Sequence, residues 1–398
     1  MDDPGVSAVI EEVEMLMPVG VRPRQLRVRT LLLGMLLCLD DHRPAHLVRV
    51  HASLVGLCER DRVRLGVVAE AHSGPHLLTY RQVERTARLV AAVLDKQDKD
   101  GTPSEMLLRL EAALLEASVT DEYKAATRSL AVDWTDIETF SCPPVVTGGS
   151  CADTEASWGH RRGDAPGQTD EVFFGYYLQL ATMTEEEGGP GVPELVRRMA
   201  LTSCHIDPPR YFVYVIVAMA GAGIEIGDVI CDSGYAHRIP EHWALVLRMA
   251  GANIVTDLHP SDRGPKGTFQ GAILNNGSLY CPATPKALFG LQPLRRGADA
   301  DEVAHHDRMT AEADRYRLGR VTDYDADGYH RVACPAVAGK LRCPHRPASM
   351  ALGYDHPEIA EPPEELPACC VQKTITVPPQ VNAKTAQSEV GRWISFKR

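Results

Sequence analysis

Two aspartates follow short apolar segments in positions where carboxylates can hold metal ions. Asp133 comes directly after Leu130–Val132 in AVDWTD, and Asp232 closes the apolar segment of DVICDSGY. Mg²⁺ is bound by one or two carboxylates together with water and substrate phosphate oxygens, and two such ions bracket the attacking and leaving oxygens of a phosphodiester. A carboxylate in the apolar interior is costly unless it is paired, hydrogen-bonded or metal-bound. A bound cation would therefore explain an interior Asp133.

Both aspartates also have a purely structural explanation. Asp232 stands before a turn into an expected helix and can cap that turn. Asp133 can accept hydrogen bonds from backbone amides where its strand ends, as short polar side chains often do. The spacing of the two residues, taken alone, favours these structural roles.

A second group of residues with metal-ligand chemistry lies nearer the C-terminus. ACPAVAGKLRCPHRP and the later PACC supply thiolates and an imidazole, which suit a tetrahedral structural zinc site. The candidates are Cys334, Cys343, His345, Cys369 and Cys370, and Cys281 in YCPAT can join them. The spacing C-x8-C-x-H differs from that of a standard zinc finger, so reduced cysteines buried in a loop-rich subdomain are the alternative.

Arginines and one histidine form a third group, suited to phosphate contacts. SWGHRRG (157–163) supplies an Arg pair in an expected loop, and residues 21–64 carry nine arginines against four acidic residues. A solvated surface is the alternative reading for each segment. The candidates for DNA contact are His160, Arg161, Arg162, Arg238, Arg27 and Arg29.

A helical region is expected before the segment that carries the aspartates. Residues 1–95 show apolar residues at helical spacing with arginines between them, which predicts a helical bundle that binds DNA or simply exposes an Arg face. The polar segment 95–101 predicts a linker. Thr102 as cap and Pro103 as first residue then predict the start of another helix.

Strands and helices are expected to alternate from residue 129 onward. Such alternation predicts a sheet covered by helices, and hence an α+β or α/β fold. We expect residues 141–170 to form a long loop. Strands are expected over 129–137, 172–183, 224–232 and ANIVTDL, and helices over 207–223 and 240–251.

The composition is that of a soluble globular protein. The 398 residues suffice for two or three domains, and 44% are hydrophobic and 24% charged. The longest apolar run, Leu31–Leu39, is interrupted by Gly34 and too short to cross a bilayer. The acidic start lacks the basic residues of a signal peptide, so we expect a cytoplasmic protein. Eleven cysteines would be unusual as disulfides there.

The net charge of −11 argues against a uniformly basic nucleic-acid binder, but it permits a local basic face.

Several separate blocks resemble, in order along the chain, actinobacterial insertion-sequence transposases of the DDE type. The resemblance covers about residue 129 to about residue 385. The matching blocks are LAVDWTDIETF, CADTEASWGHRRGDAPGQTDEVFFGYYLQLATM, VPELVRRMALTSCHIDP, GDVICDSGYAHR and AGANIVTDLHPSDRGPKGTFQGAI. The resemblance implies an RNase H-like core, a mixed sheet flanked by helices. It also implies an acidic triad that binds Mg²⁺ or Mn²⁺, with Asp133 as its first member and Asp232 as its second.

The same resemblance implies double-stranded DNA as the partner, namely the element's ends and a target, with a homodimer acting on paired ends. The residue patterns and the resemblance together suggest five regions: a helical DNA-binding domain, a linker with a helix, the catalytic core, a Cys/Pro-rich insertion and a shortened tail. These regions cover 1–95, 96–128, 129–280, 281–372 and 373–398.

The third member of the triad does not match the family pattern. In the family a glutamate follows an arginine-rich stretch beyond a block that reads TVPPQVNAKTAQ (376–387) here. The residues that follow are SEVGRWISFKR, and Glu389 lies too close to the block to match. We therefore expect a truncated or frameshifted copy that lacks the third carboxylate.

Three functions follow from these observations. The first is a transposase that cuts and joins phosphodiesters. The second is a non-catalytic remnant that recognises element ends but does not cut, motivated by the missing acid. The third is a metal-dependent nuclease that completes its site with another carboxylate, Asp136 or Asp257.

Overall fold

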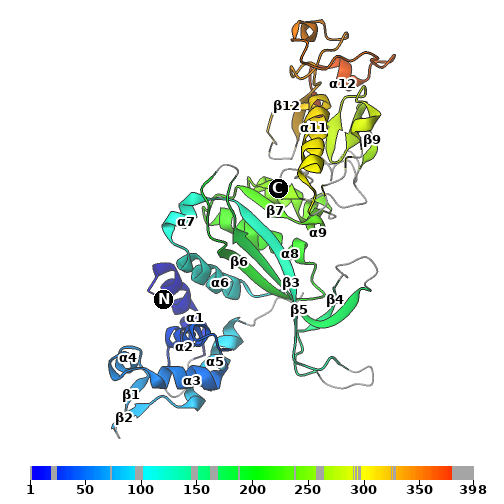
Figure 1. Cartoon of the computed structure of the whole chain (residues 1–398). Coiled ribbons are helices and arrows are strands. Elements are labelled where there is room, and N and C mark those ends of the chain that lie inside the picture. The colour runs from blue at the N-terminus through cyan, green and yellow to red at the C-terminus, as the bar shows by residue number, and fades with distance from the viewer. Residues whose placement is uncertain are drawn as a thin grey trace. The chain divides into compact units, whose positions relative to one another are not determined.

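The chain forms two compact units in a computed structural model (Figure 1). Unit 1 comprises Met1–Ala125, Trp134–Thr182 and Glu194–Pro208, and unit 2 comprises Ala126–Asp133, Met183–Pro193 and Pro209–Arg398. Among the residues that the structure describes, six strands form a mixed sheet in the order β4-β5-β3-β7-β8, with β6 paired to β5. The predicted mixture of helices and strands with a helical N-terminal region is thus confirmed. The structure describes residues 2–18, 25–71, 74–94, 102–144, 151–161, 169–186, 189–236, 239–256, 264–289, 291, 294, 297–323, 325 and 329–378.

Helices dominate the N-terminal part of unit 1, as the sequence predicts. Their bounds are α1 Pro4–Leu16, α2 Val28–Asp40, α3 Leu47–Gly56, α4 Glu59–Arg64 and α5 Tyr80–Leu94. Apolar side chains such as Val13, Val50 and Val83 are fully buried between them. An antiparallel hairpin of β1 (Val68–Ala71) and β2 (Gly74–Leu77) interrupts the helices. Its strands are too short to show a two-residue period, and the sequence analysis missed them.

Helix α6 (Glu105–Ser118) begins later than the predicted Thr102 cap. Ser104 caps it instead, because its hydroxyl oxygen accepts the N–H of Leu107 at 3.1 Å and its O–H donates to the carbonyl of Leu94 at 2.5 Å. These two bonds tie the helix start to the end of α5. A short helix, α7 (Asp121–Ala126), follows.

In the described part of unit 1, β5 (Glu171–Met183) pairs with both β4 (Ser157–Arg161) and β6 (Val196–Ser203). Strand β5 runs antiparallel to both β4 and β6. The expected strand over 172–183 is confirmed. The expected loop over 141–170 is wrong where β4 lies, because β4 is held by backbone pairing to β5 and shows no apolar alternation.

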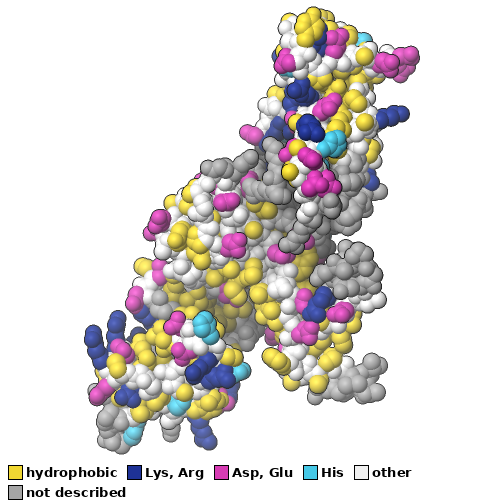
Figure 2. All heavy atoms as spheres, viewed as in Figure 1, with side chains coloured by type: hydrophobic (Ala, Val, Ile, Leu, Met, Phe, Trp, Pro, Cys, Tyr) yellow, Lys and Arg dark blue, Asp and Glu magenta, His cyan; other side chains and the backbone are white. Residues whose placement is uncertain are grey.

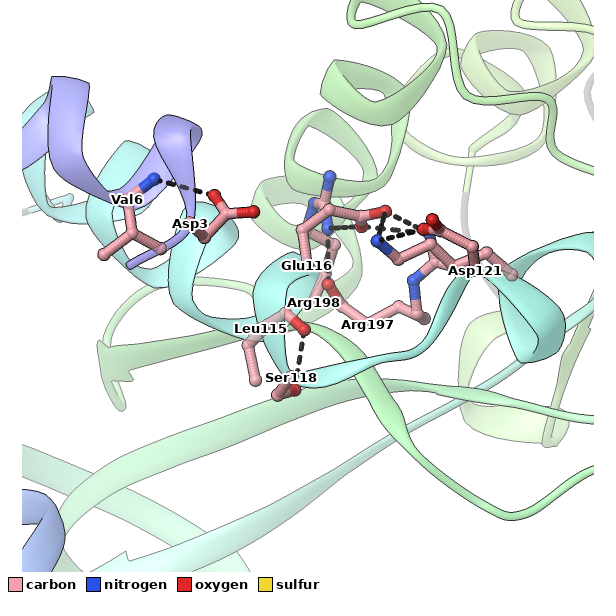
Figure 3. Close-up of polar contacts among 9 residues, drawn as sticks. Asp3, Val6, Leu115, Glu116, Ser118, Asp121, Arg197 and Arg198 are labelled. Carbon is pink, nitrogen blue, oxygen red and sulfur yellow. Dashed lines mark hydrogen bonds and ion pairs between the residues drawn. The ribbon is translucent and has the colours of Figure 1, made fainter. Parts of the chain in front are cut away.

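Strand β6 was not predicted from the sequence, because it carries two buried arginines. Arg197 and Arg198 are 4% and 6% exposed and converge on Glu116 of α6, which lies along β6 (Figures 1 and 3). The Arg197 guanidinium donates to both Glu116 carboxylate oxygens at 2.9 and 3.1 Å. Arg198 and Lys124 approach the same carboxylate at 3.5 and 3.3 Å. Two adjacent arginines in a buried strand break the pattern by which such strands are recognised.

The backbone at Gly175 of β5 lies so close to the backbone of β3 at Ile137 that only glycine fits there. Replacement of Gly175 tests this close approach. A Cβ atom there would overlap the carbonyl oxygen of Ile137. Gly175→Ala is expected to lower the free energy of unfolding by about 1–3 kcal/mol, the usual cost of overpacking. Gly221→Ala is the control, since a Cβ there meets nothing within 4 Å, and we expect a change within about 0.5 kcal/mol. Urea unfolding measures both, and equal midpoints for the two variants would contradict the close approach.

Parallel strands form the part of the sheet that belongs to unit 2. Strand β3 (Leu130–Glu138) begins there, β7 (Asp228–Cys231) runs parallel to it, and β8 (Asn253–Thr256) runs parallel to β7. The expected strands at these places are confirmed, although β7 is shorter than predicted.

Helix α8 (Pro208–Gly221) begins at Pro208 as predicted. The single helix expected over 240–251 is instead a 3₁₀ turn, η1 (Pro240–His242), followed by α10 (Ala244–Met249). Trp243 separates them because its backbone, at φ −150° and ψ −73°, leaves the helical region.

Two small antiparallel sheets and several short helices complete unit 2. The strand orders are β11-β10-β9 and β12-β13-β14. No helix within the described ranges is long and apolar enough to cross a membrane. The bounds are β9 Pro265–Phe269, β10 Ala272–Asn275, β11 Ser278–Tyr280, η3 Lys286–Leu288, α11 Ala300–Tyr316, β12 Gly319–Arg320, β13 His330–Ala333, η4 Pro347–Ala351, α12 Ala368–Val371 and β14 Ile375–Val377.

Candidate active site

The parallel pairing of β3 with β7 ends one residue before Asp133 and Asp232. The same register, continued by one residue, sets the two aspartates beside each other. Adjacent strands lie about 4.8 Å apart, and residues at one level of a parallel pair point to the same face. The two aspartates therefore follow paired residues of neighbouring strands, at the carboxyl end of β7. The pairs that define the register are Leu130 with Val229, Ala131 with Ile230 and Val132 with Cys231.

Asp133 is exposed rather than buried, which corrects the expectation of an interior carboxylate. Leu130 and Val132 are 2% and 3% exposed, so they fill the core on one side of the strand. Alternate residues of a strand point to opposite faces, and Asp133 therefore lies on the other side. Its presence incurs no burial cost that a cation would have to offset.

Asp232 also has the structural role that the sequence analysis allowed. It precedes α9 (Ser233–Ala236), and its Oδ1 accepts the N–H of Gly234 at 2.8 Å. That hydrogen bond fixes the direction of the carboxylate. An ionised carboxylate has about four acceptor positions, so the cap is compatible with a cation at the same group.

A third carboxylate is not supplied by Asp136. This residue follows Asp133 by three positions in β3, and the alternation of the strand turns it to the opposite face. The Arg161 guanidinium donates to it, with Nε at 3.0 Å, and this hydrogen bond lowers the pKa of Asp136. Asp257 and Glu389, the other carboxylates considered from the sequence, lie outside the described residues.

Arg161 is surrounded by acidic side chains, which sequence reasoning missed. Its guanidinium pairs with Asp136, with Glu138 at 2.8 Å and with Glu171 at 3.5 Å. Hydrogen bonds from Arg161 to Asp136 and Glu138 raise its pKa further. A phosphate contact would require the exchange of these partners, so the predicted DNA contact stays a prediction. Only the pairing of β4 with β5 brings Glu171 opposite Arg161, and no local pattern signals that.

The other predicted DNA contacts are spread over several elements. His160 is exposed on β4, Arg27 is exposed before α2, and Arg29 pairs with Asp2. Figure 2 shows Lys and Arg side chains over the N-terminal helices, in keeping with the cationic composition of that segment. Arg162 and Arg238 lie outside the described residues.

The structure gathers the predicted cysteines but leaves the histidine out. Cys334 and Cys343 are buried in one apolar cluster with Cys281, and Cys369 is buried in a neighbouring cluster that Cys370 contacts. His345 is exposed. All eleven cysteines are free thiols. As the side chains stand, no three or more His, Cys, Asp or Glu within the described ranges are arranged to hold a metal ion.

Comparisons with known proteins add one weak likeness. No protein-family profile matches the chain, and no curated protein matches it. Among solved structures, the "Drosophila P element transposase strand transfer complex" matches at 10% sequence identity and a TM-score of 0.25, over 78% of this chain and 71% of that one. A TM-score this low carries no argument about fold or function, so the functional conclusion rests on the residues of this chain.

Proposed function

We propose that the chain is a DNA transposase of the DDE type that uses Asp133 and Asp232 to cut and join phosphodiesters. The observation that carries the proposal is that Asp133 and Asp232 each directly follow the last printed pair, Val132 with Cys231, of the parallel strands β3 and β7. The ordered blocks that resemble insertion-sequence transposases support it, and so does a mixed sheet accompanied by helices.

The two carboxylates suit Mg²⁺ or Mn²⁺. Both ions prefer oxygen ligands, and Mg²⁺ sites commonly use one or two carboxylates while substrate phosphate and water complete the shell. Asp133 and Asp232 are exposed, so a DNA phosphate can reach the same face. When bound, the cation supplies positive charge that activates the attacking oxygen and stabilises the leaving oxygen.

Two successive reactions follow from this arrangement. In the first, water attacks a phosphorus atom at the element end, the P–O3′ bond breaks, and a free 3′ hydroxyl and a 5′ phosphate result. In the second, that 3′ hydroxyl attacks a phosphodiester of the target, a new P–O3′ bond forms, and the target strand's own 3′ hydroxyl leaves. Asp133 and Asp232 would hold the cation beside the reacting phosphate. The Gly234 N–H keeps the Asp232 carboxylate in place.

The third carboxylate decides between the transposase and its two rivals. A chain with only this pair of aspartates would bind element ends without cutting them. A chain that recruits Asp257 would cut. Asp257 directly follows Thr256, the last residue of β8, in the sequence, so Asp257→Asn is the variant that tests whether this residue is the third carboxylate.

Cleavage of the gene's own flanking DNA tests the proposal. The full-length protein would be incubated with linear DNA that contains its gene and both flanks, with Mg²⁺ or Mn²⁺, and the cut positions mapped by primer extension. We expect cuts at one fixed position on each side of the gene and no cuts in the presence of EDTA. Binding of the flanks without any cut would support the non-catalytic remnant, and neither binding nor cuts would overturn both.

A further inference from the structure

We propose that one face of helix α2 (Val28–Asp40) binds the same face of α2 in a second copy of the chain, with the two helices antiparallel. The resemblance to transposases implied a homodimer but gave no surface for it. The side chains of α2 alone define the surface, so the inference is independent of the proposed cleavage chemistry and of DNA. This outer face consists of Arg29, Leu33, Leu36, Leu39 and Asp40.

The opposite face of α2 fills the core of the N-terminal helices. Val28 and Leu31 are each 1% exposed. Gly34 lies so close to α3 that a Cβ atom there would meet side-chain carbons of Val50 and Leu54 at 2.9 Å. Because an α-helix has about 3.6 residues per turn, these core residues of α2 lie on one side of the helix and the outer face lies on the other.

The outer face carries leucines that remain in contact with water. Leu36 and Leu39 are 43% and 57% exposed, and Leu33 is half-buried. Apolar residues on both sides are the pattern of a helix that is covered on both sides. Contact with a second apolar surface removes these leucines from water, and this favours association.

The spacing on the outer face is the same when it is read from either end of the helix. Arg29, Leu33, Leu36 and Asp40 follow one another at intervals of four, three and four positions, and alternation of three and four is the spacing of a coiled-coil seam. When a second α2 runs in the opposite direction, each Arg29 lies beside Asp40 of the other copy and each Leu33 beside Leu36. The same patch is thus used by both copies, and the contact closes into a dimer. A parallel pair would set like charges beside each other, so the charges select the antiparallel direction.

The charges at the two ends of α2 oppose its dipole. Arg27 and Arg29 stand at the start of the helix and Asp40 and Asp41 at its end, whereas acidic groups favour the start of a helix and basic groups its end. Asp2 pairs with Arg29, whose side chain is 40% exposed, and a guanidinium has enough N–H donors to hold a second carboxylate. An antiparallel partner brings the basic start of one α2 to the acidic end of the other and so compensates both ends.

The contact is small, and its size sets its strength. Helix α2 has 13 residues, which gives it a length of about 20 Å. A pair of helices of this length buries less than the roughly 1,200 Å² at the lower limit of stable interfaces. We therefore expect a dissociation constant in the micromolar range.

Charge exchange between two variants tests the pairing. Arg29→Asp and Asp40→Arg each place like charges at both ends of the contact. We expect each to weaken self-association at least about tenfold in sedimentation equilibrium of the full-length protein without DNA. An equimolar mixture of the two variants restores opposite charges at both ends, so we expect the mixture to associate close to the wild-type level. A different apolar partner on this face would gain nothing from the mixture.

Two further variants separate the apolar part of the contact from a general effect of charge. Leu36→Glu puts a carboxylate into the centre of the outer face, and we expect it to abolish the dimer. Arg81→Asp is the matched control for Arg29→Asp, because it makes the same change at an exposed arginine of another N-terminal helix, α5. We expect the control to associate like wild type.

A double variant covers the case in which a single charge reversal fails to fold. Arg29→Asp combined with Asp40→Arg reverses both charges in one chain and gives α2 the charges that its dipole favours, so we expect it to dimerise with itself like wild type. A wild-type chain that stays monomeric up to roughly 100 µM, single variants that associate like wild type, or a mixture no tighter than its components would each overturn the inference. A monomeric chain that still cuts DNA would overturn this dimer and leave the proposed function standing.

Discussion

Asp133→Asn and Asp232→Asn are each expected to slow metal-dependent DNA cleavage by at least about a thousand-fold. Residues that act as one catalytic unit depend on each other, so the loss of any one of them removes most of the rate. The amide keeps the shape of the side chain but removes the negative charge that holds a cation. Because both aspartates are exposed, the free energy of unfolding should change by less than about 0.5 kcal/mol. The rate is measured on DNA with the gene's flanks, under single-turnover conditions.

Asp228→Asn is the matched control for these two variants. Asp228 is the first residue of β7, whereas Asp232 follows its last residue, so the control carries the same change on the same strand away from the carboxyl end. We expect its cleavage rate to stay within about threefold of wild type, in line with a surface change away from the site. Equal losses of cleavage rate in Asp228→Asn and in Asp232→Asn would contradict a specific role for the residue at the carboxyl end of β7.

Glu116→Ala is expected to cost about 3 kcal/mol of unfolding free energy, because removal of one partner leaves a buried charge without compensation. Arg197 and Arg198 are both nearly fully buried on β6, and Glu116 is the shared carboxylate that they contact. The measurement is urea unfolding. Glu12→Ala is the control, since its pair with Arg109 is partly exposed, and exposed pairs contribute at most about 1 kcal/mol. Equal losses of unfolding free energy in Glu116→Ala and Glu12→Ala would contradict the larger contribution that we assign to the buried ion pair.

Acid should weaken the same contact in a defined direction. Burial raises the pKa of Glu116, but the hydrogen bond and charge of Arg197, with the charge of Lys124, outweigh burial and hold this pKa below its ordinary value of 4.5. The unfolded chain therefore takes up the proton first as the pH falls. The stability that this group contributes is present above pH 4.5 and is lost as the pH falls through the folded-state pKa. Glu116→Gln should flatten this part of the stability profile.

Local signals predicted several elements. The apolar residues Leu130–Val132 indicated the strand that carries Asp133, and Asp207 with Pro208 indicated the start of α8. Strand β6 could not be predicted in the same way. The burial of Arg197 in this strand depends on its ion pair with a carboxylate that lies 81 positions away in the sequence. A long-range ion pair leaves no periodic signal in the strand that it stabilises.

The candidate site was predicted in its residues but not in its geometry. The sequence placed Asp133 and Asp232 on strands, yet it could not show that β3 and β7 pair in the register that aligns them. It also assigned Asp133 to the interior, since the alternation that turns it outward depends on which strand face meets the core. The ring of acids around Arg161 depends in the same way on strand pairing.

Iron-directed cleavage of the polypeptide backbone tests most directly whether Asp133 and Asp232 hold one cation together. Fe²⁺ would replace Mg²⁺ in the full-length protein, ascorbate and peroxide would generate radicals at the bound ion, and the fragments would be mapped by mass spectrometry. The predicted result is cleavage close to both residue 133 and residue 232, suppressed by excess Mg²⁺ and lost at both places in Asp232→Asn. Cuts confined to other segments, or cuts that Asp232→Asn leaves unchanged, would contradict a shared metal site on these strands.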